Sequence, residues 1–204
     1  MKMKLYLIRH GQTMFNRIGR VQGWCDSPLT EEGIAQAKQL GEGLFSVPFV
    51  AAYSSSSERT IDTAHCIIGN REIPLSTTKQ LKEMCFGTLE GTRNLRPQGV
   101  SIIDFFQHGF IASGGENYDI LLERILHQLK KIGDANPKGN VLVVTHGGVI
   151  AVLGHHLNAK NGNDEEERQK QVIVNPPANC SVTIIEYENE EFKLLSYGDI
   201  SYRQ

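Results

Sequence analysis

The sequence predicts an α/β fold with three layers, in which helices cover both faces of a mostly parallel central sheet. Short apolar runs alternate with amphipathic segments along the 204 residues, which is typical of strands joined by crossover helices. The strongest run, Val141–Val144, is continuous and rich in β-branched residues, as in a central strand buried on both faces. A chain of this length is expected to fold around one hydrophobic core. We therefore expect a single domain over residues 1–204, with an insertion at about 84–116 that covers a site.

The individual elements follow from apolar spacing and from turn and capping residues. Besides the run at 141–144, strands are expected at Lys4–Arg9, Phe49–Ser54, Ile73–Thr77, and in a closing hairpin of Cys180–Glu188 and Phe192–Tyr197. Helices are expected at Thr30–Phe45, Glu58–Ile68, Asn117–Ile132 and Gly147–Leu157, with a further helical stretch at Ser101–His108 inside the insertion. Thr30 is a suitable N-cap, followed by two glutamates in the positive first turn. The polar segment Asn158–Gln171 is expected to be an exposed loop.

Composition and charge exclude several classes of protein. An apolar fraction of 40% and a net charge of −2 are those of an ordinary globular protein and give no bulk basicity for nucleic-acid binding. No apolar stretch is long enough for a membrane span, so we expect neither a nucleic-acid nor a membrane partner. The four cysteines are scattered without a Cys-x-x-Cys pair, which argues against a zinc site and against a disulfide framework. The sequence therefore favours a reduced, cytoplasmic protein.

Two histidine motifs follow the two best strands. Arg9-His10-Gly11 ends the first strand, and Thr145-His146-Gly147-Gly148 follows the strand at 141–144. In open α/β sheets, ligands bind beyond the carboxyl ends of the strands, so we expect both histidines at one rim. Glycines there allow close backbone approach, and a helix N-terminus offers N–H groups to an anion.

Further candidates lie near other predicted strand ends. Arg59 falls in the first turn of a helix, where a cation opposes the helix dipole, and an anionic ligand would explain it. Glu83 and Glu90 lie beside flexible glycines, and either is a candidate general acid. Taken singly, each of these residues is more often a solvated surface group.

Together, the motifs resemble the histidine phosphatase superfamily, the phosphoglycerate mutase-like group, over roughly residues 4–197. The matching segments are Arg9-His10-Gly11 with Thr13 and Asn16, Gln22-Gly23-Trp24, Asp26 through Gly33, Ser54 through Arg59 with Thr63-Ala64, Glu83 before Phe86-Gly87, and Thr145 through Gly148. Each segment is weak alone, but their joint order is specific.

The resemblance implies a phosphotransfer site. His10 would be the nucleophile that becomes phosphohistidine, and Glu83 the proton donor to the leaving oxygen. Arg9, Arg59 and His146 would hold the phosphoryl oxygens with help from Asn16, Gly147 would admit the phosphate to the helix start, and Gln22 and Gly23 would line the substrate pocket. Guanidinium groups bind phosphate through planar forks. With that positive charge, we expect no metal or cofactor.

The same site suits two reactions, and we favour a phosphatase acting on a small phosphorylated metabolite. Glycolytic mutases of this group typically carry an adjacent Arg-Arg pair, which this sequence lacks, and an Asn-Lys step where this chain has Thr92-Arg93-Asn94. Phe105 and Phe106 instead suggest an apolar wall in the insertion. The alternatives are mutase-type phosphoryl transfer and a catalytically silent phosphate-binding regulatory protein. No long exposed strand or heptad predicts a dimer.

Overall fold

A computed structural model describes residues 2–93, 108–160 and 176–203 of the chain. Its strands are β1 (Met3–Arg9), β2 (Phe49–Ser55), β3 (Leu75–Thr78), β4 (Gly139–Thr145), β5 (Val182–Glu188) and β6 (Glu191–Asp199). Its α-helices are α1 (Met14–Ile18), α2 (Glu31–Gly43), α3 (Glu58–Ile68), α5 (Tyr118–Ala135) and α6 (Gly147–Lys160). Short 3₁₀ turns occur at Lys79–Leu81 (η1), Gly87–Leu89 (η2) and Ile111–Ser113 (η3).

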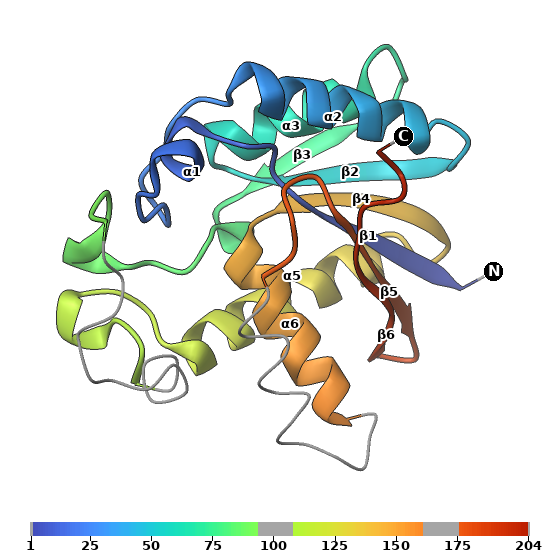
Figure 1. Cartoon of the computed structure of the whole chain (residues 1–204). Coiled ribbons are helices and arrows are strands. Elements are labelled where there is room, and N and C mark those ends of the chain that lie inside the picture. Colours follow the sequence, from blue (N-terminus) through green and yellow to red (C-terminus); the bar gives the residue numbers. More distant parts are fainter. Residues whose placement is uncertain (1, 94–107, 161–175, 204) are drawn as a thin grey trace.

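The six strands form one mixed sheet in the order β3-β2-β4-β1-β5-β6. Strands β3, β2, β4 and β1 run parallel, and the β5–β6 hairpin adds two antiparallel strands beside β1. Figure 1 shows this twisted sheet in the middle of the molecule. The predicted α/β class with a mostly parallel sheet is confirmed.

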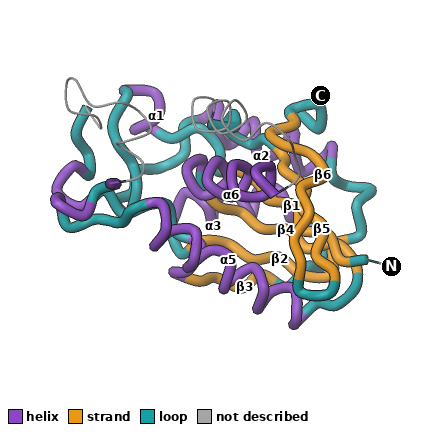
Figure 2. Tube along the Cα trace, turned by 90° about the horizontal axis from the view of Figure 1, so that it is seen from below, coloured by secondary structure: helices purple, strands orange, loops and turns teal. Residues whose placement is uncertain are grey.

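Helices cover both faces of the sheet, as the three-layer prediction requires. Helices α2 and α3 pack on one face and α5 and α6 on the other (Figure 1), and the view from below places α5 and α6 in front of the strands (Figure 2). Each face has its own apolar core, because alternate residues of β1 and β4 point to opposite sides. Leu5, Leu7 and Val143 join the α5–α6 side, whereas Ile8 and Val144 join the α2–α3 side.

The register of the two central strands determines where the site forms. Arg9 at the end of β1 pairs with Thr145 at the end of β4, and the His10 N–H donates to the Thr145 carbonyl at 3.0 Å. The residues that leave these strands, His10 and His146, therefore emerge side by side. The expected meeting of the two histidine motifs at one rim is found.

Helix α1 was not predicted from the sequence. It is five residues long and buries no residue, so it has no apolar periodicity to detect. A capping box defines its start: the Thr13 hydroxyl accepts from the Asn16 N–H, and the Asn16 side chain accepts from the Thr13 N–H. The signal was present in the sequence as a Thr followed three residues later by an amide.

Other boundaries shift by a few residues. Strand β3 begins at Leu75 instead of 73, and α6 continues to Lys160, so the start of the segment expected as loop, 158–160, is helical. The rest of that loop lies outside the described residues, as do residues 101–107 of the helical stretch expected at Ser101–His108, including Phe105 and Phe106. None of the described helices is both long and apolar enough to cross a membrane.

The described parts of the predicted insertion, 84–93 and 108–116, pack against each other. The Phe86 and Phe110 rings meet edge to face with centroids 4.6 Å apart, and the Glu116 N–H donates to the Cys85 carbonyl at 2.9 Å. Gly87 has φ +58°, and a Cβ there would overlap the Ser113 carbonyl. These contacts tie the two ends of the insertion together at the edge of the predicted site.

Candidate active site

His10 and His146 are buried at the carboxyl ends of β1 and β4, with exposures of 4% and 0%. Their ring centroids are 5.5 Å apart at an interplanar angle of 64°. Burial, followed by the positive charge of nearby arginines, holds the pKa of each imidazole well below the ordinary 6.5. Both rings are therefore neutral near pH 7.

The hydrogen bonds of the two rings indicate their tautomers. Nδ1 of His10 lies 2.8 Å from the Gly11 carbonyl, which only accepts, so Nδ1 carries the hydrogen and Nε2 keeps its lone pair. Nδ1 of His146 lies 2.9 Å from Nη2 of Arg59, which only donates, so His146 has its hydrogen on Nε2. That hydrogen points to the Ser55 hydroxyl at 2.9 Å.

Arg59 is fully buried and turns inward from the first turn of α3. Its Nη1 donates to the Cys25 carbonyl at 3.0 Å and to Asp26 Oδ1 at 2.8 Å, and its Nη2 donates to the Gly23 carbonyl at 2.8 Å and to His146. These contacts join the segment after α1 to the end of β4. The remaining donor nitrogen, Nε, is buried without a hydrogen-bond partner among the described residues.

Asp26 is a site residue that the sequence reasoning missed as an individual group. Besides its ion pair with Arg59, its Oδ2 accepts from the Glu58 N–H at 2.6 Å, the first residue of α3. The N-cap residue of α3, Ser57, makes no side-chain capping bond, so Asp26 supplies the acceptor from another segment. A buried arginine is usually paired with a carboxylate. An inward-facing Arg59 would therefore have pointed to a nearby acidic partner such as Asp26.

Arg9 lies beside the start of α6. Its Nη1 donates to the Pro177 carbonyl at 2.6 Å, and its Nε is buried without a partner among the described residues. A Cβ on Gly147 would lie 3.2 Å from that Nε. The absence of a side chain at Gly147 therefore allows the Arg9 guanidinium to approach the backbone at the start of α6. The Nε–H groups of Arg9 and Arg59 are two unpartnered buried donors in a region rich in positive charge.

The Glu83 carboxyl group lies on the N-terminus of α6. Its oxygens accept from the backbone N–H groups of Gly148 at 2.8 Å, Val149 at 3.2 Å and Met84 at 2.9 Å. Two of the helix N–H groups that were expected to face a ligand, those of Gly148 and Val149, therefore bind Glu83 instead. Burial raises the pKa of Glu83 above the ordinary 4.5, and the hydrogen bonds from Gly148 and Met84 only partly offset this rise.

Glu90, the other candidate acid, has a different environment. Its oxygens accept from the backbone N–H groups of Gly23, Trp24, Cys25 and Phe86, at 2.8–3.1 Å. Burial raises the pKa of Glu90, but the hydrogen bonds from Cys25 and its neighbours outweigh this effect, and the pKa is lowered overall. Glu90 therefore stays ionised and holds two loops together, whereas Glu83, with its raised pKa, remains the candidate acid.

The remaining predicted residues connect to this cluster through hydrogen bonds. The Asn179 side-chain amide donates to the His10 carbonyl at 2.9 Å and to Asn16 Oδ1 at 3.3 Å. The Thr13 hydroxyl donates to Gln22 Oε1 at 2.6 Å. The Gly23 carbonyl binds Arg59, as described. Asn179, like Ser55, was not singled out from the sequence, because an isolated amide in a turn carries no distinctive pattern.

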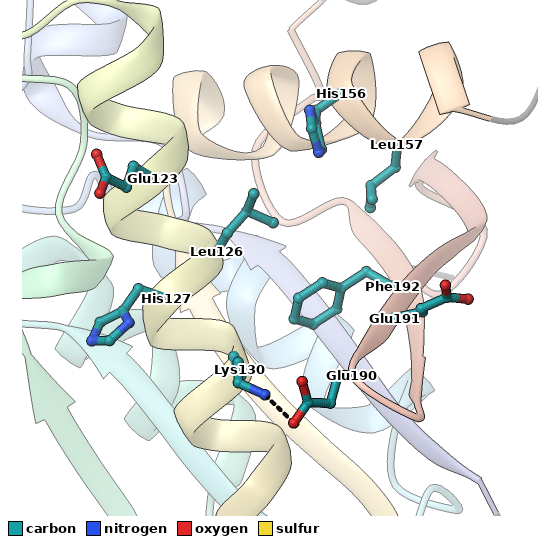
Figure 3. A pocket seen from close by; sticks show the side chains of 9 residues that line it. All are labelled: Glu123, Leu126, His127, Lys130, His156, Leu157, Glu190, Glu191 and Phe192. Carbon is teal, nitrogen blue, oxygen red and sulfur yellow. Dashed lines mark ion pairs between the residues drawn. The ribbon is translucent and has the colours of Figure 1, made fainter.

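A cavity of about 260 Å³ opens beside these groups. Its lining includes Arg9, Gln22, Glu83 and Gly147, together with Gly148. A larger hollow of about 620 Å³ lies between α5, α6 and the β5–β6 turn (Figure 3), where Lys130 pairs with Glu190 at 2.8 Å. The described residues that line this hollow include none of the predicted site residues. Of these two cavities, the smaller one is lined by predicted site residues.

Comparison with known proteins agrees with this fold. A family model described as the histidine phosphatase superfamily (branch 1) matches residues 5–200. The chain is 30% identical to a metal-independent phosphoserine phosphatase of Arabidopsis thaliana, covering 98% of this chain and 82% of the relative. It is 32% identical to the adenosylcobalamin/alpha-ribazole phosphatase of Escherichia coli strain K12, covering 74% and 77%.

The structural comparison gives the same class. A crystal structure of phosphoglycerate mutase from Bacillus anthracis strain Sterne superposes with a TM-score of 0.83 at 31% identity, covering 98% of this chain and 95% of that one. A phosphotransfer enzyme built on an α/β sheet is the class that the fold and the relatives define. The chain belongs to the histidine phosphatase superfamily, and the predicted family and enzyme class are confirmed.

Proposed function

We propose that this chain hydrolyses phosphomonoesters of small metabolites without a metal, through a phosphohistidine formed on His10. The observation that carries the proposal is the tautomer of His10. Its Nδ1–H is bound to the Gly11 carbonyl at 2.8 Å, so the lone pair of Nε2 is available for attack. The neutral state of this buried ring makes it a nucleophile near pH 7.

The surrounding donors would neutralise the phosphoryl charge. Phosphoryl transfer depends mostly on positioning and on electrostatic stabilisation of the three peripheral oxygens. The buried Nε–H groups of Arg9 and Arg59 have no other partner among the described residues, and they suit this purpose. His146 has one N–H donor, at Nε2, which binds the Ser55 hydroxyl. With substrate bound, this N–H would donate its hydrogen bond to a phosphoryl oxygen instead.

The reaction then takes two steps. In the first, His10 Nε2 forms a bond to phosphorus while the bond to the ester oxygen breaks, and Glu83 gives its proton to that oxygen. In the second, a water attacks phosphorus, Glu83 takes a proton from it, and the His10–phosphorus bond breaks to release inorganic phosphate. The raised pKa of Glu83 suits a group that must first donate and then accept a proton.

A mutase would return the phosphoryl group to a second hydroxyl of a carboxylate-bearing substrate. Among the described residues that line the cavity, the cations are Arg9 and Arg20, and Arg20 donates to the Gly91 carbonyl at 2.5 Å. Arg20 is thus the one cation apart from Arg9 that these described residues offer to a second anionic group, and the absence of a paired set of cations here supports hydrolysis over mutase chemistry. A cytoplasmic location belongs to the same proposal and is supported by the free thiols of all four cysteines.

The test measures phosphate release in EDTA from a panel of phosphomonoesters. The panel contains phosphoserine, alpha-ribazole 5′-phosphate and 3-phosphoglycerate, with product analysis for 2-phosphoglycerate. We expect metal-independent release that is lost in His10→Ala, with Lys38→Ala, an exposed change on α2, as the matched control. Conversion of 3-phosphoglycerate to 2-phosphoglycerate without phosphate release would show that the enzyme is a mutase and would contradict the proposal. No turnover of any substrate would favour a silent phosphate-binding protein.

A further inference from the structure

The cavity beside Arg9 and Glu83 is lined by a few polar groups and by a larger set of apolar side chains. Its apolar lining consists of Val21, Met84, Phe86, Phe110, Tyr118, Ala151, Val152 and Pro176. Because Glu83 is the proposed donor to the ester oxygen, the leaving alcohol would extend from Glu83 along this wall. We infer that the preferred substrates are phosphomonoesters whose alcohol part is apolar and ring-bearing, an inference that rests on the proposed function.

Three aromatic side chains form this wall, and the structure holds two of them firmly. Phe110 is 2% exposed and meets Phe86 edge to face with centroids 4.6 Å apart. The Tyr118 hydroxyl is 2.8 Å from His155 Nδ1 and 3.5 Å from the Val152 carbonyl, so its ring presents carbon to the cavity while its polar end is satisfied. Rigid aromatic surfaces favour planar apolar groups through offset or edge contacts.

The charges at the wall disfavour a polar or anionic alcohol. Among the described lining residues, the charged ones are Arg9, Glu83 and Arg20, and the first two belong to the proposed phosphate and proton-donor groups. Arg20 uses its Nη1 to bind the Gly91 carbonyl. A carboxylate on the leaving group would exchange its hydration for a mostly apolar surface, a cost in free energy that only a contact with Arg20 could offset. A phenyl ring would gain by leaving water.

The experiment compares esters whose leaving alcohols have similar basicity. Phosphate release from 2-phenylethyl phosphate and from ethyl phosphate is compared through kcat/KM, with 3-phosphoglycerate as the anionic member. An apolar group in a hydrophobic pocket typically changes kcat/KM by roughly 10- to 200-fold, and we expect a preference in this range for the phenyl ester. Phosphate release with a ratio near one, or fastest turnover of 3-phosphoglycerate, would overturn the inference and leave the phosphatase intact. If no ester is hydrolysed, the proposed function itself fails.

A pair of variants tests whether the wall causes the preference. Phe86→Ala should reduce the phenyl-to-ethyl ratio by about 10-fold or more, because the backbone bonds of residue 86 to Glu90 and Leu89 do not need the ring. The matched control is Phe45→Ala, since Phe45 is 73% exposed beyond α2, and this change should leave the ratio unaltered. An equal ratio in Phe86→Ala and wild type would contradict the inference.

A second measurement keeps the test valid if Phe86→Ala fails to fold. Inhibition of the wild-type enzyme by 2-phenylethylphosphonate is compared with inhibition by ethylphosphonate, since both bind without turnover. We expect the inhibition constant for the phenyl compound to be lower by about 10-fold or more. Equal inhibition constants would show that the wall does not recognise the ring.

Discussion

Oε2 of Glu83 accepts a hydrogen bond of 2.8 Å from the backbone N–H of Gly148, the second residue of α6. This contact places a buried carboxyl group on the positive end of a helix, next to the proposed phosphate site. Burial favours its protonated form, whereas the helix N–H groups favour its ionised form. These opposing effects act on the same carboxyl group, and both protonation states are needed for the proposed roles of acid in the first step and base in the second.

Replacing Glu83 by Gln should slow the hydrolysis of esters with basic leaving groups. Without a proton donor, an alkoxide leaves poorly, and we expect kcat/KM for the phenylethyl ester to fall by roughly 10²- to 10⁴-fold. An aryl phosphate with an acidic phenol needs little protonation, so its loss should be much smaller. The measurement is kcat/KM for both esters in wild type and Glu83→Gln. Equal losses on the two esters would remove Glu83 from the role of general acid.

Gly148→Ala should act through Glu83. A Cβ at this position would lie 2.5 Å from Glu83 Oε1, and the three N–H bonds that hold the carboxylate prevent an easy shift. We expect kcat/KM for the alkyl ester to fall by about 10-fold or more, with the folded state retained because alanine is a good helix former. In a double-mutant cycle, Gly148→Ala should cost much less in a Glu83→Gln background. Fully additive losses would show that the two residues act independently.

The buried neutral histidines predict a loss of stability in acid. The pKa of both His10 and His146 is lowered in the folded state, so below pH 6.5 the unfolded chain binds protons that the folded chain does not. The free energy of unfolding should therefore decrease as the pH falls below 6.5, by up to about 1.4 kcal/mol per pH unit for each histidine. The contribution is fully present above pH 6.5.

Urea unfolding between pH 5 and 7.5 measures this dependence, and imidazole ¹⁵N NMR assigns it. His10 should keep its neutral Nδ1–H tautomer as the pH falls through 6.5. Protonation of His10 at or above pH 6.5 would contradict the structure.

Asp26 should matter to stability as well as to the site. Asp26→Ala removes the carboxylate that pairs with the buried Arg59. It also removes the oxygen that accepts a hydrogen bond from the Glu58 N–H at the start of α3. We expect the free energy of unfolding to fall by about 2–3 kcal/mol, somewhat less than for a fully buried pair, because the Asp26 side chain is 26% exposed. Glu31→Ala, an exposed carboxylate in the first turn of α2, is the control for general charge effects. A loss as small as that of the control would show that the ion pair contributes little.

Glu90 should act as a positioning residue. It holds the backbone of Gly23, Trp24 and Cys25, whose carbonyls at 23 and 25 bind Arg59, and it also holds Phe86 near Glu83. Glu90→Gln loses an anionic acceptor, and bonds to charged groups contribute about 1.5–3 kcal/mol each. We expect reduced stability and a lower kcat for alkyl and aryl esters alike. A loss confined to alkyl esters would instead make Glu90 a proton donor.

The sequence predicted the parts of the fold that depend on local patterns. The run of valines in β4, the Thr30 cap of α2 and the amphipathic spacing of α5 are each visible in a few consecutive residues. Helix α1 was missed because it buries nothing, and its start depends on a single pair, Thr13 and Asn16. Boundaries such as the end of α6 depend on tertiary packing.

The candidate site was predictable where residues of unusual chemistry follow strands or enter helix starts. His10, His146, Arg59 and Glu83 are of this kind. Asp26, Ser55 and Asn179 are ordinary residues whose importance comes from long-range contacts, and no local spacing places Ser55 beside His146. The choice between Glu83 and Glu90 also needed the structure, because it depends on which backbone N–H groups surround each carboxylate.

The most direct test of the central claim is to trap the phosphorylated enzyme. The protein is mixed with a ³²P-labelled phosphomonoester, quenched in alkali within milliseconds and analysed by peptide mapping, with His10→Ala as the control. The account predicts label that is stable in alkali, labile in acid and located on His10, and no label in the variant. Turnover in the wild type without labelling of His10, or label on another residue, would contradict it.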